Sequence, residues 1–373
     1  MRDLMWRRVR RLTRFARRDD RGAVGVLVAV LVACGVLLGI GALAVDVGQL
    51  YSQRAQLQNG ADAGALAVAK TCAEGACSPG TATSYANANS ATNTAAVDLV
   101  CGSGSLGACP APTGTMYDCP AAPPAGTNFV DVHTSTLTPG GSTLLPPSFA
   151  RTLLGMSNYQ GSTVRACAQA EWGPPLAGGG LAVTISACEW DHATQNGTVF
   201  GPPPPYPPNP LPSPSVDQVL HLHTASSGGL SCPTEPAGAD GPGLFGWTND
   251  PMNNCTSPII NGQYGGSTGA SISQACKTAI SAAQQNKTLL FMPIYVSVSG
   301  TGNNGVYTLK GFAAFVITGY HLPGFNAPDW LNKANDCKGS SFCINGYFTQ
   351  GLIPTPGSIG GPNLGADIIV LSG

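Results

Sequence analysis

The sequence predicts an α+β protein in which a single N-terminal transmembrane helix continues into a juxtamembrane helix, followed by a disulfide-stabilised, β-rich ectodomain. Three observations predict this class. Residues 22–45 form an uncharged apolar run, and twelve of the thirteen cysteines follow it. Only 10% of the residues are charged, against 49 glycines and 31 prolines, which favours strands and turns over long soluble helices. The 43% of hydrophobic residues are enough for a packed core.

The apolar run from Gly22 to Val45 is long enough to cross a bilayer. As an α-helix it would span about 36 Å, against about 30 Å for the hydrocarbon core. A cleaved signal peptide is the alternative, because Ala42-Leu43-Ala44 fits the small-x-small cleavage pattern. The run exceeds the ~7–15 apolar residues of a usual signal peptide, which favours a retained anchor.

Charge asymmetry predicts the orientation. Residues 1–21 contain nine arginines and three aspartates, whereas residues 46–373 contain nine Lys/Arg against sixteen Asp/Glu. A basic flank stays cytoplasmic. We therefore expect a cytoplasmic tail over residues 1–21 and an exported ectodomain on a single-pass protein of the cell membrane. The acidic ectodomain argues against a nucleic-acid partner, and the arginines are expected to bind anionic lipid head groups.

Residues 46–71 continue the helical pattern beyond the membrane. Their apolar residues recur at steps of three, four or seven, which is a helical stripe: Val47, Leu50, Leu57, Ala61, Ala65 and Val68. We expect one rod of about 45 residues, loosened near Gly60 and Gly64, with small residues that permit close approach of a partner helix. Within the membrane, Gly35 and Gly39 form a GxxxG pattern, which predicts self-association of the anchor helix, extended outside by the same stripe.

The cysteines predict a disulfide framework. An even number in an exported chain is typical of a set of bridges. The candidates are Cys72, Cys77, Cys101, Cys109, Cys119, Cys167, Cys188, Cys232, Cys255, Cys276, Cys337 and Cys343. Short separation favours local bridges at Cys72–Cys77 and Cys337–Cys343. The full connectivity stays open, and metal binding is the weaker alternative because no CxxC occurs.

The pattern of the ectodomain, residues 72–373, indicates strands separated by turns. Strands are expected from β-branched or alternating residues at 129–135, 164–171, 181–188, 219–224, 289–299, 306–320, 342–348 and 366–371. Helices are expected over 81–99 and 148–154, and irregular chain over 225–270. The proline-rich stretch 201–214 predicts extended polyproline II. It either divides the ectodomain near residue 210 or forms a long loop within one domain.

Catalytic signals are weak. Residues 265–269 match G-x-S-x-G around Ser267, but no apolar strand precedes them, and a nucleophile elbow needs a strand before it and a helix after it. No Walker A sequence, dinucleotide fingerprint or HExxH occurs. We therefore expect no enzymatic activity and no cofactor.

One histidine pair is the strongest metal pattern in the sequence. His221 and His223 would lie on one face of a strand, with Asp217 or His192 as a third zinc ligand, yet no spacing pattern supports a site. Ordinary strand alternation explains the pair equally well, so no metal is predicted. The polar cluster beside Trp190 is expected to mark the end of a strand: Glu189, Asp191 and His192.

The N-terminal segment resembles TadG-like proteins, which accompany the tight-adherence (Flp-type) pilus machinery. The resemblance covers about residues 19–70. It rests on Asp20-Arg21-Gly22-Ala23-Val24, the apolar run, Ala44-Val45-Asp46-Val47-Gly48, Tyr51, Arg54-Ala55-Gln56-Leu57-Gln58 and Ala61-Asp62-Ala63. The later stretches 141–147, 170–175, 188–190 and 310–315 are similar in style to actinobacterial members of that group. The resemblance implies an envelope protein anchored by one helix and linked to pilus assembly.

One departure separates this chain from pilins. These subunits carry Glu five residues after the Gly of a prepilin-peptidase site, and here that position, counted from Gly22, is Leu27. We therefore expect a structural or assembly component of a pilus system, with pilus-assembly proteins as partners, and not a pilus subunit. Two alternatives remain: a surface adhesin or binding ectodomain that needs no pilus, and an envelope hydrolase using Ser267 or a histidine site.

Overall fold

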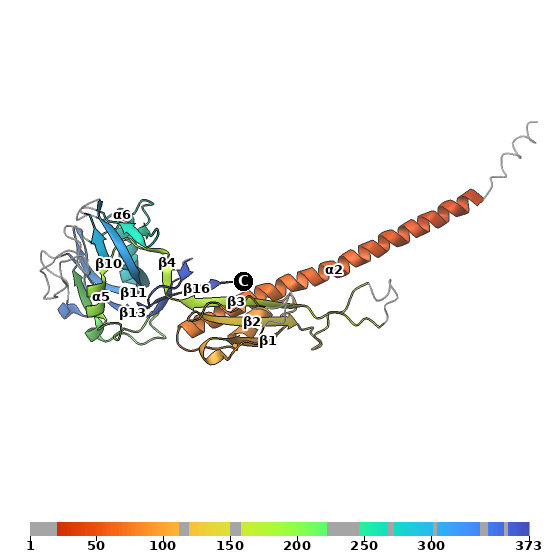
Figure 1. The fold of residues 1–373 in the computed structure, drawn as a ribbon, viewed down its shortest axis with the longest axis horizontal. Helices are drawn as coiled ribbons and strands as arrows, with labels where there is room; N and C mark the ends of the chain where they lie inside the picture. The colour runs from red at the N-terminus through yellow and green to blue at the C-terminus, as the bar shows by residue number, and fades with distance from the viewer. Residues whose placement is uncertain are drawn as a thin grey trace, which may run out of the picture.

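One helix runs through the membrane segment and into the body of the protein. The computed structural model describes residues 21–111, 119–149, 158–221, 246–267, 272–300, 304–335, 342–353 and 357–372. Its first element, α2 (Arg21–Ala73), is a helix of 53 residues, about 80 Å long. The N-terminal half of α2 projects away from the body, and its C-terminal half lies on a sheet (Figure 1). The predicted continuous rod is therefore confirmed.

The loosening expected near Gly60 and Gly64 is wrong. The helix continues through both glycines, which face α3 (Thr81–Ala88). A Cβ at Gly60 would lie 3.1 Å from the Cα of Ala86, and one at Gly64 would lie 3.3 Å from the Cα of Ala82. The missing side chains let the two helices pack in backbone contact. The partner helix that the small residues predicted thus belongs to the same chain.

The first sheet has the strand order β1-β2-β3-β16-β14. Its strands are β1 (Ala95–Gly102), β2 (Asn128–Thr136), β3 (Arg165–Gly173), β16 (Ala366–Leu371) and β14 (Gly351–Ile353). Neighbours are antiparallel, apart from the parallel pair β14 and β16. The C-terminal strand therefore completes a sheet whose first three strands come from the N-terminal half of the chain.

One face of this sheet is covered by α2. Small buried side chains meet there: Ala61 and Ala65 of α2 share a cluster with Ala168 and Ala170 of β3 and Val132 of β2. Because little side-chain volume separates them, helix and sheet approach closely at the density of a protein interior. The intervening residues of β2 and β3 point to the opposite, more polar face.

The second sheet has the order β6-β10-β11-β13-β7, with β9 and β12 also paired to β11. Its strands are β6 (Ile185–Ser186), β10 (Leu289–Ser299), β11 (Val306–Leu322), β13 (Cys343–Thr349), β7 (Gln218–His221), β9 (Gln263–Gly265) and β12 (Phe325–Ala327). Met292, Phe315, Ile317 and Ile344 are fully buried in its core. This sheet lies at the end of the body away from the projecting part of α2 (Figure 1).

Two helices, α5 (Ala187–Ala193) and α6 (Gln274–Asn286), pack on the second sheet. The Ser273 hydroxyl caps α6 by accepting a hydrogen bond from the Cys276 backbone N–H at 3.1 Å, and a disulfide joins Cys276 to Cys255. The remaining short strands are β4 (Pro175–Ala177) paired with β15 (Ser358–Ile359), and β5 (Gly179–Leu181) paired with β8 (Thr256–Pro258). Short 3₁₀ turns occupy Gly104–Leu106, Pro214–Val216 and Lys333–Asn335.

The two sheets share one apolar cluster. Phe312 and Ala314 of β11 pack with Ile353 of β14 and with Ala366 and Ile368 of β16, and all five are buried. Each sheet also takes strands from both sides of the proline-rich stretch 201–214. That stretch therefore does not separate the strands of one sheet from those of the other.

Most of the expected strands are confirmed. The predictions at 129–135, 164–171, 289–299, 306–320, 342–348 and 366–371 correspond to β2, β3, β10, β11, β13 and β16. The prediction at 219–224 corresponds to β7, and its last residues lie outside the described part of the chain, as do most of 148–154 and much of 225–270.

The helix predicted over 81–99 is wrong beyond Ala88. A turn with Asn93 at φ +52° follows α3, and the chain then enters β1. The Asn87 side chain accepts a hydrogen bond from the Ala95 backbone N–H at 2.8 Å, which closes the turn. β-branched Val97 and Val100 pair with β2, so strand pairing overrides the helical composition of the preceding residues.

The strand predicted over 181–188 is interrupted between β5 and β6 and is wrong beyond Ser186, the last residue of β6. Ser186 caps the helix that follows, because its hydroxyl accepts the backbone N–H of Glu189 at 3.1 Å. Ser-x-x-Glu is the sequence signature of a capping box. The polar cluster of Glu189, Asp191 and His192 therefore lies on α5, not at a strand end.

The proline-rich stretch is not one extended polyproline helix. It turns at residues 206–209, where the Asn209 backbone N–H donates to the carbonyl of Pro205 at 3.3 Å. The Tyr206 hydroxyl donates to the carbonyl of Pro202 and contacts the hydroxyl of Tyr347 on β13. The segment folds back on the second sheet because these side-chain contacts favour a compact loop over an extended one.

The disulfide framework is present. The described bridges are Cys72–Cys77, Cys101–Cys109, Cys119–Cys167 and Cys255–Cys276. Cys188 and Cys343 each belong to a disulfide as well. Cys232 and Cys337 lie outside the described residues. Cys34, in the apolar half of α2, is a free thiol.

Candidate functional site

The projecting half of α2 exposes a continuous apolar surface. Leu27, Leu31 and Leu37 have 61–69% of their surface accessible, and Val45 at the end of the run has 51%. Among the described residues, α2 is the one helix long and apolar enough to cross a membrane. An apolar surface of this size is unfavourable in water and is satisfied by lipid. The projecting half of α2 is therefore a candidate membrane anchor, consistent with a single-pass membrane protein.

The predicted anchor residues all lie on this helix. Gly22 lies in its first turn, and Val45 directly precedes the first buried carboxylate. Gly35 and Gly39 have open space where a side chain would lie. The stripe behaves differently, since Leu57, Ala61, Ala65 and Val68 are buried within their own chain. The predicted extension of a contact with a second copy along this stripe is therefore wrong from Leu57 onward.

At the membrane end of the ectodomain, Asp46 holds a loop against α2. This aspartate is 8% exposed. One of its carboxylate oxygens accepts the backbone N–H groups of Ser148 at 2.7 Å and Phe149 at 3.0 Å. The side chain of Gln49 accepts the Ser148 hydroxyl at 2.9 Å. From the sequence alone, Asp46 had no assigned role. The signal that could have identified this residue is its position directly after 24 uncharged residues.

Further along α2, polar side chains fasten the helix to the first sheet. Gln58 donates through Nε2 to Asp62 at 2.8 Å and to the carbonyl of Cys167 on β3 at 2.9 Å. The hydroxyl of Thr134 on β2 donates to the carbonyl of Leu57 at 3.1 Å. These bonds, with the alanine packing, fix how the helix and the sheet are oriented.

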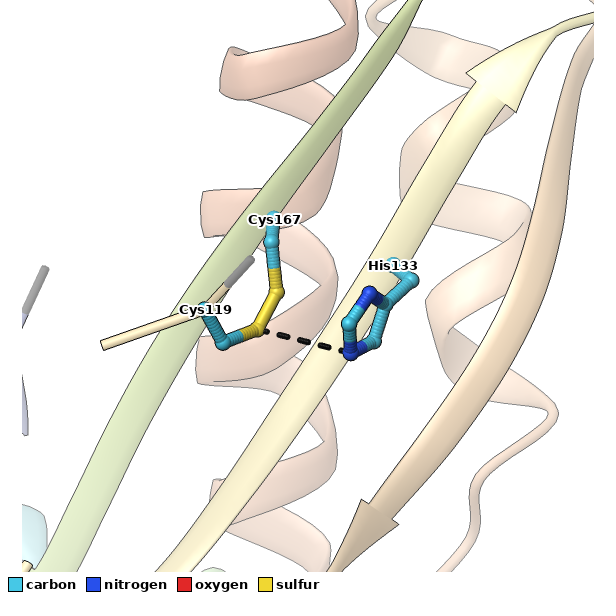
Figure 2. A group of neighbouring side chains, drawn as sticks. All are labelled: Cys119, His133 and Cys167. Carbon is cyan, nitrogen blue, oxygen red and sulfur yellow. Dashed lines mark hydrogen bonds between the residues drawn. A yellow bond between two sulfur atoms is a disulfide. The ribbon is translucent and has the colours of Figure 1, made fainter. Parts of the chain in front are cut away.

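A disulfide on the opposite face of the sheet packs against a histidine. Cys119–Cys167 joins the chain before β2 to β3, and the Cys119 sulfur lies 3.6 Å from Nε2 of His133 (Figure 2). Three such groups would suit a metal only as free ligands, because thiolate is the metal-binding form of cysteine. Because both sulfurs are in a disulfide, the group is a covalent cross-link packed beside the imidazole of His133.

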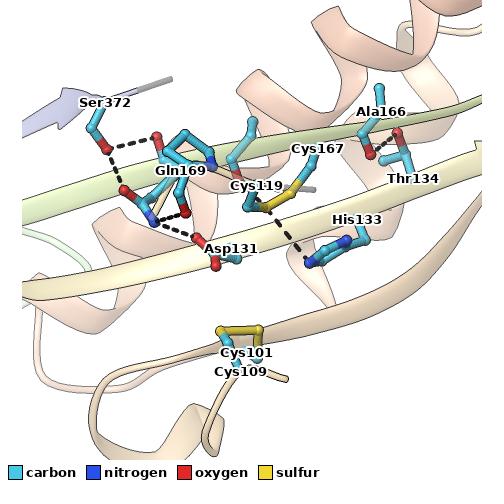
Figure 3. Close-up of a disulfide and its surroundings, with 12 residues drawn as sticks. Cys101, Cys109, Cys119, Asp131, His133, Thr134, Ala166, Cys167, Gln169 and Ser372 are labelled. Atoms are coloured by element: carbon cyan, nitrogen blue, oxygen red, sulfur yellow. Dashed lines mark hydrogen bonds between the residues drawn. A yellow bond between two sulfur atoms is a disulfide. The ribbon is translucent and has the colours of Figure 1, made fainter. Parts of the chain in front are cut away.

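A second disulfide and a buried carboxylate complete this face. Cys101–Cys109 lies below Asp131, and Gln169 donates to the Asp131 carboxylate at 2.9 Å (Figure 3). Burial raises the pKa of Asp131, and the Gln169 hydrogen bond and the electrostatic interaction with His133 partly offset that rise. A cavity of about 480 Å³ lies between the two bridged loops and is lined by Asp131, His133 and both Cys109 and Cys119. The two bridges hold together loops that share little regular structure.

The residues weighed as catalytic or metal-binding are dispersed. Ser267 lies two residues beyond the end of β9, and its backbone N–H donates to the carbonyl of Trp247. Thr268 and Gly269 lie outside the described residues. Asp217 is buried and accepts the Thr318 hydroxyl at 2.8 Å.

The histidines also lie on separate elements. His221 is on β7, His192 is on α5, and His223 lies outside the described part of the chain. Asp191 forms an ion pair with Lys310 at 3.5 Å. Over the described side chains, the groupings with metal-ligating potential are the two cysteine groups of the first sheet.

The comparisons with known proteins agree with the membrane anchor. Residues 22–71 match the family model described as "Putative Flp pilus-assembly TadE/G-like". The chain thus carries a TadE/G-like segment that coincides with nearly all of α2, as its sequence resemblance predicted. Neither the curated proteins nor the solved structures yielded a match.

Proposed function

We propose that this protein is a membrane-anchored envelope protein that acts as a structural or assembly component of a tight-adherence (Flp-type) pilus system. The observation that carries the proposal is α2 itself. Its matched segment, residues 22–71, joins an apolar membrane half to a half buried in the ectodomain. No flexible linker separates the two halves, so α2 would transmit a position or a force between the membrane and the body.

The proposed orientation of the protein in the membrane follows from its charge distribution and from cysteine chemistry. Nine arginines in residues 1–21 favour a cytoplasmic tail. The bridged cysteines favour an oxidising compartment for the body. We therefore place residues 46–373 on the exported side of the cell membrane, and we propose a role in binding and assembly without catalysis.

In-cell photo-cross-linking tests the proposed partnership. Large exposed side chains on the part of the body distant from the anchor offer positions for a photoreactive residue: Leu211, Met252 and Ile260, at 63–77% exposure. We expect adducts with pilus-assembly proteins in intact cells, and their loss in a strain that lacks the pilus genes. Unchanged adducts and unchanged abundance in that strain would contradict the proposal and favour an adhesin that needs no pilus.

We further propose that the anchor helices of two copies associate through Gly35 and Gly39. Both lie on the projecting half of α2, and a Cβ at either glycine would have no neighbour within 4 Å. Small residues permit backbone contact between helices in lipid. Gly35→Leu with Gly39→Leu should abolish the cross-linked dimer of the full chain. Gly41→Leu is the matched control, since it adds the same kind of side chain outside the GxxxG pattern. Dimer that persists in the double variant would show that the helix is only a tether.

A further inference from the structure

Exposed apolar side chains lie near the point where the apolar run of α2 ends. On the helix, Val47 is 41% exposed and Tyr51 is 71% exposed. On the loop that Asp46 holds, Leu144 is 39% exposed and Phe149 is 44% exposed. Two segments about 100 residues apart in sequence thus present large apolar side chains at one level of the molecule.

The position of these side chains relative to the bilayer follows from their place along the axis of α2. Asp46 is the first residue after the uncharged run, so its hydrogen bond to Phe149 fixes the loop beside the end of the membrane segment. With a rise of about 1.5 Å per residue, Tyr51 lies about 9 Å beyond Val45 along the axis. The polar interface of a bilayer is about 5–8 Å thick on each side of the hydrocarbon core. With Val45 at the edge of the hydrocarbon core, Phe149 would lie within the interface and Tyr51 near its outer edge.

The loop is tied in place at both ends of its exposed part. Leu145 and Ser162 exchange backbone hydrogen bonds at 3.0 and 3.2 Å, and Pro146-Pro147 restrict the backbone just before Ser148. Asp46 and Gln49 then hold Ser148 from the side of the helix. Apolar side chains on this loop are thus presented at a defined height.

The chemistry of the loop suits a lipid surface. Residues 137–149 contain no charged side chain, so their entry into the interface removes no charge from water. Tyrosine, as at position 51, is favoured at the level of the head groups, and Phe and Leu are typical of the apolar side of segments that lie in the interface. The carboxylate of Asp46, which would be unfavourable near lipid, is already hydrogen-bonded and shielded by the loop.

We propose that the loop around Leu144 and Phe149 is a second membrane contact, inserted in the outer bilayer interface beside α2 and held there by Asp46. The partner is the lipid bilayer itself. The inference rests on the proposed membrane anchoring of α2. Because both α2 and the loop beside it would contact the bilayer, the tilt of α2 would be restricted. The body would then stand at a fixed angle to the membrane.

Photo-cross-linking to lipid tests this contact. The full chain, reconstituted in nanodiscs of phosphatidylethanolamine and phosphatidylglycerol, would carry p-benzoylphenylalanine at one position, and lipid adducts would be measured by mass spectrometry. Leu38, 66% exposed in the apolar run, is the positive control, and Met252, 77% exposed on the body, is the negative control. We expect the adduct yield at Phe149 to exceed that at Met252 at least about fivefold.

The outcomes separate the two proposals. Adducts at Leu38 with background yield at Phe149 would overturn the second contact and leave the anchor standing. Background yield at Leu38 would overturn both. Protein–protein adducts at Phe149 in place of lipid adducts would assign the loop to a second copy and also overturn the inference.

Variants of Asp46 test what holds the loop. Asp46→Ala removes the acceptor of both backbone N–H groups and should at least halve the lipid adduct at Phe149, with the Leu38 adduct unchanged. Asp46→Asn keeps one acceptor oxygen and should give an intermediate yield. Equal yields at Phe149 in all three proteins would contradict the role of Asp46. Intact disulfides and an unchanged unfolding temperature of the body would show that each variant folds.

Discussion

Replacing Gly60 with valine should destabilise the body of the protein, because this glycine is where α2 and α3 are in backbone contact. A Cβ at Gly60 would lie 3.1 Å from the Cα and 3.3 Å from the carbonyl oxygen of Ala86. Carbon atoms in good contact are about 3.5–4.0 Å apart, so α3 would have to move by roughly half an ångström for the Cβ alone. Overpacking of this kind costs about 1–3 kcal/mol, and the better helix propensity of valine returns only about 0.4 kcal/mol.

Thermal unfolding of the full chain in detergent micelles measures the effect. We expect Gly60→Val to unfold about 3–8 °C below the wild-type protein. Gly48→Val is the matched control, since Gly48 lies on the same helix with nothing within 4 Å of a Cβ, and its unfolding temperature should not fall. Equal unfolding temperatures for the two variants would refute the reasoning that Gly60 is required by the contact with α3.

Two further predictions concern pH and the disulfides. Burial raises the pKa of Asp367 from 3.8 to about 6, so the fold binds this proton more tightly than the unfolded chain and stability falls as pH rises from about 4 to 6. Asp367→Asn should remove that fall and add at most about 3 kcal/mol at pH 7, measured by thermal unfolding across pH; parallel pH profiles for variant and wild type would contradict it. Replacing Cys119 and Cys167 by serine should cost about 4 kcal/mol, against about 2 kcal/mol for Cys72 and Cys77, because the bridges close loops with separations of 48 and 5 residues. The reverse order of unfolding midpoints in denaturant would contradict the loop-closure argument.

The course of α2 could be predicted from local pattern alone. An uncharged run long enough for a bilayer and a stripe at steps of three and four define a helix whatever it packs against. What the stripe contacts could not be predicted, because Ala61 and Ala65 fit equally well against a helix of another copy, α3 or the alanines of β3. Small side chains permit close approach without specifying the partner.

Long-range polar contacts were beyond sequence reasoning for a related reason. Asp46 bonds to backbone N–H groups about 100 residues away, and Gln58 bonds to the carbonyl of Cys167. Backbone groups carry no sequence signature, so such partners emerge only once the strands are in register. The cap at Ser186 is different, because the Ser-x-x-Glu pattern is present in the sequence. This pattern predicts a helix start after Ser186, where the strand indeed ends.

Strands were predicted best where alternation or β-branched residues were strong, as in β10, β11 and β16. Their assembly into two sheets was not predictable, because β16 pairs with β3 nearly 200 residues earlier in the chain. The same applies to Cys119–Cys167, whose cysteines meet only because β2 and β3 are neighbours. Local bridges such as Cys72–Cys77 follow from short separation, and distant ones follow from topology.

The central claim is that one helix links a cytoplasmic tail to an exported, folded body, and amine labelling tests it most directly. All six lysines lie beyond residue 45, and residues 1–21 contain none. Lys70 has 62% of its side chain exposed, and Arg14→Lys would place a reactive amine in the tail at unchanged charge. In spheroplasts treated with a membrane-impermeant amine reagent, Lys70 should be modified at once and residue 14 of that variant only after permeabilisation. Modification of residue 14 without permeabilisation, or a mature chain that begins at Val45, would contradict the account.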